Sequence, residues 1–180
     1  MKILRRLFSK RAKINAATAK IDDMVYLLNY ERHYADTLTG LGECQMGPEV
    51  LAELFLFRAW TTQFGYRIFC SDKDASEKLI AKTINSTKYL GLAMFREVHG
   101  FSVEDTLGAD YMSLVEDRWR NYDLVVSTHT GDGIPTMEVM AELTRRLGVA
   151  DPAVTYQLSI DFLGQLDQIK KTAIELGILR

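Results

Sequence analysis

Hydrophobic side chains surround the whole circumference of one segment, residues 48–69, with the sequence PEVLAELFLFRAWTTQFGYRIF. Pro48 suits the first turn of a helix, because its fixed φ fits there and its missing N–H has no helical partner in any case. On a helix, Leu56 and Trp60 share one side with Glu49 and Glu53, so that no side is wholly polar. The pattern predicts a central helix that packs against its neighbours over most of its circumference.

Apolar residues at helical spacing continue on both sides of this segment. They predict a long helix within residues 12–35, another from about residue 73 with a bend or break around residues 85–91, and further helices opening at Ser102 and Pro152. Segments in which apolar and polar residues alternate over the length of a β-strand are almost absent. We therefore expect an all-α fold: a single-domain bundle of five long helices at residues 14–180, preceded by a short amphipathic helix at residues 1–13.

The first thirteen residues are basic, whereas the rest of the chain is acidic. They contain 6 of the 22 Lys and Arg residues and none of the 24 Asp and Glu residues, which leaves 16 bases against 24 acids. Apolar residues recur at helical spacing in the same stretch, so a helix there has an apolar and a cationic face. Nucleic-acid binding, a transit peptide, docking on the acidic body and a loose tail are alternative interpretations. Peripheral contact with a membrane or partner is expected to use Lys2, Arg5, Arg6, Phe8 and Arg11.

Composition is typical of a cytoplasmic globular domain. With 180 residues and 47% hydrophobic content, the chain is long enough for one buried core. Cys44 and Cys70 are too few for a disulfide scaffold and do not form a zinc motif. No apolar run reaches the length of a transmembrane helix, and the N-terminus lacks the features of a secretory signal. We expect a cytoplasmic protein without a metal or cofactor.

Two places carry residues that suit ligand binding. Arg58 lies on an apolar side of the central helix, so it needs either a structural carboxylate partner or an anionic ligand. The loop STHTGDGIP at residues 127–135 combines His129 and Asp132 with two glycines and leads into a helix that begins near Thr136. Backbone N–H groups at such a loop and helix start attract anions, although a polar glycine-containing turn also has this composition and Asp132 repels an anion.

Residues 137–163, MEVMAELTRRLGVADPAVTYQLSIDFL, resemble the helix-turn-helix of bacterial regulators. The resemblance implies DNA binding through the second helix. However, Gln157 stands where the motif has an apolar anchor, and the stretch from Leu147 to Ile169 contains three aspartates and no Lys or Arg. Because a recognition helix must approach phosphates, we do not expect nucleic-acid binding here. The same residues also predict two ordinary helices, with Gly148 as the C-cap of the first and Asp151 as the N-cap of the second.

No motif points to catalysis, so we expect a non-enzymatic helical interaction or regulatory module that binds a protein partner or a second copy of itself. If their side of the central helix is not covered within the chain, Leu56 and Trp60 would form the interface. The alternative is a small-molecule binding protein or enzyme for an anion or carboxylate. Its pocket would lie between helices near Arg58 or the His129 loop.

Overall fold

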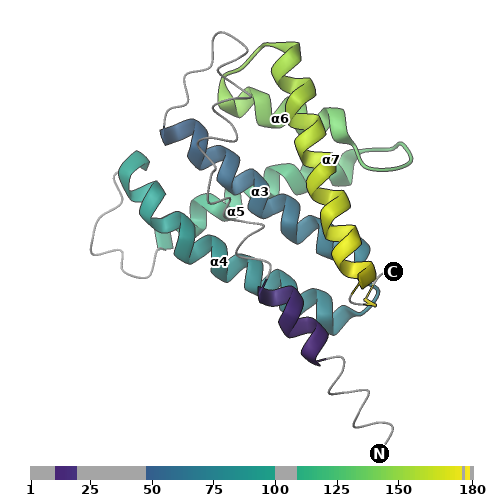
Figure 1. Ribbon diagram of the computed structural model, residues 1–180. Coiled ribbons are helices and arrows are strands. Elements are labelled where there is room, and N and C mark those ends of the chain that lie inside the picture. Colours follow the sequence, from purple (N-terminus) through teal and green to yellow (C-terminus); the bar gives the residue numbers. More distant parts are fainter. Residues whose placement is uncertain (1–10, 20–47, 100–108, 176, 179–180) are drawn as a thin grey trace, which may run out of the picture.

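The computed structural model describes residues 11–19, 48–99, 109–175 and 177–178 (Figure 1). This part of the chain forms six helices and no strands, which confirms the predicted all-α class. The first helix spans residues 11–19. The others are α3 (Pro48–Phe69), α4 (Lys73–His99), α5 (Ala109–Thr128), α6 (Thr136–Leu147) and α7 (Pro152–Glu175).

Helix α3 lies at the centre of the bundle, in contact with α4, α5, α6 and α7. Every residue from position 54 to position 66 is buried. The prediction of a helix packed over most of its circumference is therefore confirmed. Ring pairs join α3 to α5 and α7: the Trp60 ring lies 5.0 Å from that of Tyr122, and the Phe57 ring lies 5.6 Å from that of Phe162.

Leu56 and Trp60 are both 0% exposed, so the predicted interface on α3 is wrong. Helix α5 covers this side of α3. The Trp119 indole donates a hydrogen bond to the Leu56 carbonyl at 3.1 Å, and the Trp60 indole donates one to Asp123 at 2.9 Å. The two apolar residues among acids on one side of the helix indicated an inner surface, not a docking surface.

Helix α4 runs from Lys73 to His99 as one helix, so the predicted alternative of a break around residues 85–91 is wrong. Gly91 is instead a point of close approach between helices, because a Cβ there would collide with the hydroxyl of Tyr111 and the ring of Phe55. The same tyrosine hydroxyl donates a 2.6 Å hydrogen bond to the Thr87 carbonyl. Packing against α3 and α5 therefore maintains the helix across the glycine.

The connection from α6 to α7 has the predicted caps. Gly148 adopts a left-handed conformation at φ 67° and ends α6, and Asp151 accepts a 2.8 Å hydrogen bond from the Ala153 N–H at the start of α7. The far end of α7 returns to the turn between α3 and α4, where the Ser71 N–H donates to the Ile178 carbonyl at 3.0 Å. These contacts fix α7 along the length of α3.

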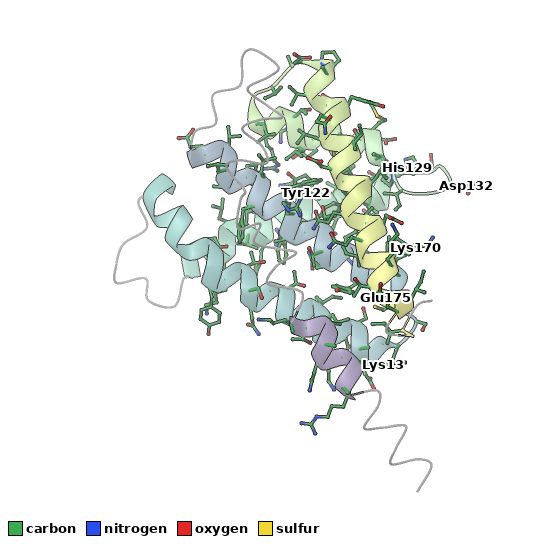
Figure 2. All side chains as sticks on the ribbon, viewed as in Figure 1. Lys13, Tyr122, His129, Asp132, Lys170 and Glu175 are labelled. Carbon is green, nitrogen blue, oxygen red and sulfur yellow. The ribbon has the colours of Figure 1, made fainter. Side chains whose placement is uncertain are left out.

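The helix at residues 11–19 runs across positions 13 and 14, where we expected the basic segment to give way to the bundle. Ile14 and Ala17 are buried, whereas Arg11 and Lys13 are exposed. Lys13 Nζ lies 2.9 Å from the position that a Cβ would take on Gly177, close to the end of α7 (Figure 2). The other predicted membrane or partner contacts, Lys2, Arg5, Arg6 and Phe8, lie outside the described residues.

Candidate interaction surface and pocket

Arg58 lies in the interior of the bundle, with 8% of its surface exposed. Its main-chain carbonyl accepts a 2.9 Å hydrogen bond from the amide of Gln165 on α7, and the same amide donates to the Thr62 hydroxyl at 2.8 Å. A buried glutamine from α7 thus occupies the space beside this part of α3. This contact could not be predicted from the sequence, because the two partners are 107 positions apart.

His129 and Asp132, the loop residues predicted to bind a ligand, lie at the periphery of the bundle (Figure 2). His129 Nδ1 is 3.1 Å from a carboxylate oxygen of Glu138, in the first turn of α6. Asp132 is exposed, and the Thr136 hydroxyl donates to the Ile134 carbonyl at 3.4 Å. These contacts hold the loop against the start of α6, and no described contact links it to Arg58.

A network of ion pairs joins α3, α5 and α6. Glu53 on α3 accepts a 3.1 Å hydrogen bond from Arg118 and one of 3.3 Å from the Tyr122 hydroxyl. Arg146 on α6 pairs with Glu142 at 2.7 Å and lies 3.9 Å from Glu53. The Glu53, Glu142 and Arg146 side chains are mostly buried, so the network clamps three helices together.

The electrostatic environment of this network shifts two pKa values in opposite directions. Hydrogen bonds from Arg145, followed by the charges of Arg146 and Arg145, lower the pKa of Glu142 against the opposing effect of burial. Burial raises the pKa of Tyr122 well above its usual value, and the negative charge of Glu53 adds to this effect. The network therefore favours an ionised Glu142 and a neutral Tyr122.

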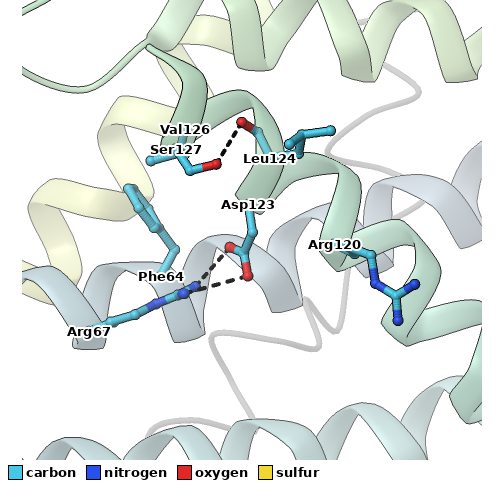
Figure 3. Close-up of a pocket in the computed structure, with 7 residues that line it drawn as sticks. All are labelled: Phe64, Arg67, Arg120, Asp123, Leu124, Val126 and Ser127. Atoms are coloured by element: carbon cyan, nitrogen blue, oxygen red, sulfur yellow. Dashed lines mark hydrogen bonds and ion pairs between the residues drawn. The ribbon is translucent and has the colours of Figure 1, made fainter. Parts of the chain in front are cut away.

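An open pocket of about 480 Å³ lies between α3 and α5 (Figure 3). Arg67 of α3 forms a two-point ion pair with Asp123 of α5, at 2.9 and 3.4 Å. The sequence analysis did not identify this pocket, although Ser127 on its wall belongs to the polar loop segment that we had considered. The complete lining consists of Phe64, Arg67, Arg120, Asp123, Leu124, Val126 and Ser127.

Helix α7 has a second apolar face that points away from the bundle. Its inner side buries a stripe that includes Leu158, Phe162 and Leu166. On the other side Tyr156, Ile160 and Leu163 are 70%, 46% and 48% exposed. These three residues recur at intervals of four and three, which places them on one face of the helix.

Gly164 lies in the middle of α7 beside this exposed face. A Cβ built on it would meet nothing within 4 Å. Glycine in a helix interior costs roughly 0.5–1 kcal/mol relative to alanine. The fold of the single chain therefore gives no packing reason for glycine at this position. The sequence shows that α7 has apolar residues on two sides, but only the structure shows that the side with Tyr156, Ile160 and Leu163 is uncovered.

No protein-family model, characterised protein or solved structure matches this chain. In the described residues no helix is long and apolar enough to cross a membrane. The same residues contain no group of three or more His, Cys, Asp or Glu side chains arranged to hold a metal ion.

Proposed function

We propose that this chain is a non-enzymatic helical interaction module that pairs with a second copy of itself through the exposed face of α7. The observation that carries the proposal is the combination of three exposed apolar side chains, Tyr156, Ile160 and Leu163, with a neighbouring glycine that has open space above it. Apolar surface gathered on one face favours association, because contact removes that surface from water.

A second copy suits this face because the arrangement of its residues is self-complementary. In an antiparallel pair of α7 helices with a twofold axis at Ile160, positions 156 and 164 lie equally far from the axis. The large ring of Tyr156 is then opposite Gly164 of the partner subunit, and the two Ile160 side chains meet. A twofold interface of this kind uses the same patch on both copies. The glycine permits the close approach that a larger residue would prevent.

The expected association is weak and depends on concentration. A standard stable interface buries roughly 800 Å² on each partner. One face of a single helix offers less than this, and further along α7 the exposed surface becomes charged, with Asp167 and Lys171 paired at 2.6 Å. A reversible dimer is compatible with a regulatory role. We keep the cytoplasm as the proposed compartment, on the basis of the low cysteine content.

Sedimentation equilibrium of the wild-type chain and the Ile160→Asp variant tests the proposal. The wild type is expected to show a monomer–dimer equilibrium, and the variant is expected to remain monomeric because dimerisation would bring two buried carboxylates together. Tyr89→Asp is the control, since Tyr89 is also a large exposed residue, on α4, with 77% exposure. A wild-type chain that stays monomeric at high concentration would reject the proposal, as would equal effects of the two substitutions.

A further inference from the structure

We infer that the pocket between α3 and α5 binds a small organic anion with an apolar body. This inference is independent of pairing through α7, because none of the pocket residues belongs to that helix. The pocket combines an apolar surface from Phe64, Leu124 and Val126 with the Arg67 guanidinium. Arg120 also belongs to the lining, and its side chain is directed away from Asp123 (Figure 3).

Arg67 is held in place before any ligand arrives. Its guanidinium makes the two hydrogen bonds to Asp123 and lies 5.9 Å from the centre of the Phe64 ring. Asp123 is itself fixed by the 2.9 Å hydrogen bond from the buried Trp60 indole. Because an arginine carries more N–H donors than these two bonds use, and the side chain is 46% exposed, Arg67 can also donate to a bound anion.

The pocket has an excess of positive charge. It contains two guanidinium groups and one carboxylate, and Figure 3 shows the Arg120 side chain directed away from Asp123. In the described part of the chain Arg120 forms no ion pair. The lining residues therefore carry a net charge of +1 in a chain whose formal net charge is -2, which favours an anion at this place.

The apolar part of the pocket identifies the body of the ligand. Leu124 is 57% exposed and lies one helical turn after Arg120, while the Phe64 side chain continues inward to the stacked Trp60 ring at 5.0 Å. A volume of about 480 Å³ falls in the range of roughly 300–1,000 Å³ that is usual for small-molecule sites. An acid group at the Arg67 guanidinium and a short alkyl or aromatic body against Leu124 would satisfy both parts.

Isothermal titration calorimetry with octane-1-sulfonate and the neutral octane-1-sulfonamide tests this inference, because the two probes share one apolar body and differ in charge. We expect the sulfonate to bind wild-type protein about tenfold more tightly than the sulfonamide, as befits a charge-assisted contact. Arg120→Gln should reduce that preference, because it removes the excess positive charge of the lining, and Leu124→Ser should weaken both probes. Lys78→Gln, which also removes one positive charge from an exposed helical position, should leave both affinities unchanged.

Two results would overturn the inference: no difference between the sulfonate and the sulfonamide, or equal losses in Arg120→Gln and Lys78→Gln. Binding that is abolished by Ile160→Asp and unaffected by Leu124→Ser would also overturn it, because the probe would then occupy the α7 face. Circular dichroism of every variant checks that the helices remain intact. Failure of this experiment leaves dimerisation through α7 unaffected, since sedimentation measures that property separately.

Discussion

Helices α3 and α7 each contain a glycine within an apolar segment, but the two glycines have different surroundings. A Cβ on Gly65 of α3 would lie 2.8 Å from Ile169 Cδ1, whereas a Cβ on Gly164 of α7 would meet nothing within 4 Å. The first glycine is explained by the fold of the single chain, because it lets α3 and α7 approach each other. The second has no such explanation, and this difference is what directs attention to the outer face of α7.

The same contrast holds for the polar groups of the two helices. Along α3, Glu53 finds its partners inside the bundle, in Arg118 and the Tyr122 hydroxyl. Along the outer face of α7, the charged pair of Asp167 and Lys171 is formed within the helix and remains exposed. The buried side chains of α3 thus find their partners within one chain, whereas α7 has such partners on its inner side alone.

The largest expected effect in this comparison is that of Glu53→Gln. The substitution retains the size of the side chain but removes the charge that Arg118 and Arg146 face in a mostly buried site, so we expect the free energy of unfolding to fall by about 3 kcal/mol. Urea unfolding of dilute protein measures it. Glu116→Gln, at an exposed position of α5, serves as the control and should change stability little. Equal stability of the two variants would show that the network does not clamp the helices.

Gly65→Ala should destabilise the chain by about 2 kcal/mol, because the new methyl group overpacks the contact with Ile169 and Leu166. The same urea experiment measures the change. A double variant with Ile169→Val, which removes a methyl group from the facing side chain, should recover part of the loss. If Gly65→Ala were as stable as the wild type, the close approach of α3 and α7 would not require glycine.

Glu142→Gln should destabilise the chain at neutral pH by about 1 kcal/mol, because the ionised carboxylate accepts hydrogen bonds from two arginines. Since the fold lowers the pKa of Glu142, its contribution is present above the ordinary value of 4.5 and is lost as the pH falls through the lower folded-state value. The difference between variant and wild type should therefore shrink on acidification. Unfolding curves from pH 7 to pH 3 measure it, and a constant difference would contradict the assignment.

Gly164→Ala is expected to have the smallest and opposite effect on the monomer. It should raise the free energy of unfolding by about 0.5 kcal/mol, because alanine is the better helix former and the space above position 164 is open. The same variant should weaken the dimer, since the added methyl group meets the Tyr156 ring of the partner. Urea unfolding of dilute protein and sedimentation at high concentration separate these two effects. A stabilised monomer with unchanged dimerisation would place the interface elsewhere.

Local sequence signals predicted several helix limits but not the contacts between helices. The limits of α3 and the caps at Gly148 and Asp151 followed from residues within a few positions of one another. The glycine near the middle of α4 predicted a break, because its effect on an isolated helix is unfavourable, whereas contact with Tyr111 and Phe55 overrides that effect.

The candidate sites could not be predicted in the same way, because they depend on contacts between distant positions. The pair of Arg118 and Glu53 is separated by 65 positions, and that of Arg67 and Asp123 by 56. The spacing of apolar residues along a helix also does not show which apolar side is covered by other helices. Trp60, which would have formed an interface on an uncovered side of α3, is buried, whereas Ile160, which the sequence analysis did not single out, is 46% exposed.

Oxidative cross-linking of an Ile160→Cys variant, in a Cys44→Ser background, tests the central claim most directly. Cys70 is free and buried, so the new thiol is the reactive group. If α7 pairs antiparallel about Ile160, the two thiols face each other across the twofold axis, and mild oxidation should give a disulfide-linked dimer in high yield. Tyr89→Cys in the same background should give little. Equal yields from the two variants, or no dimer from Ile160→Cys at concentrations where the wild type self-associates, would contradict the account.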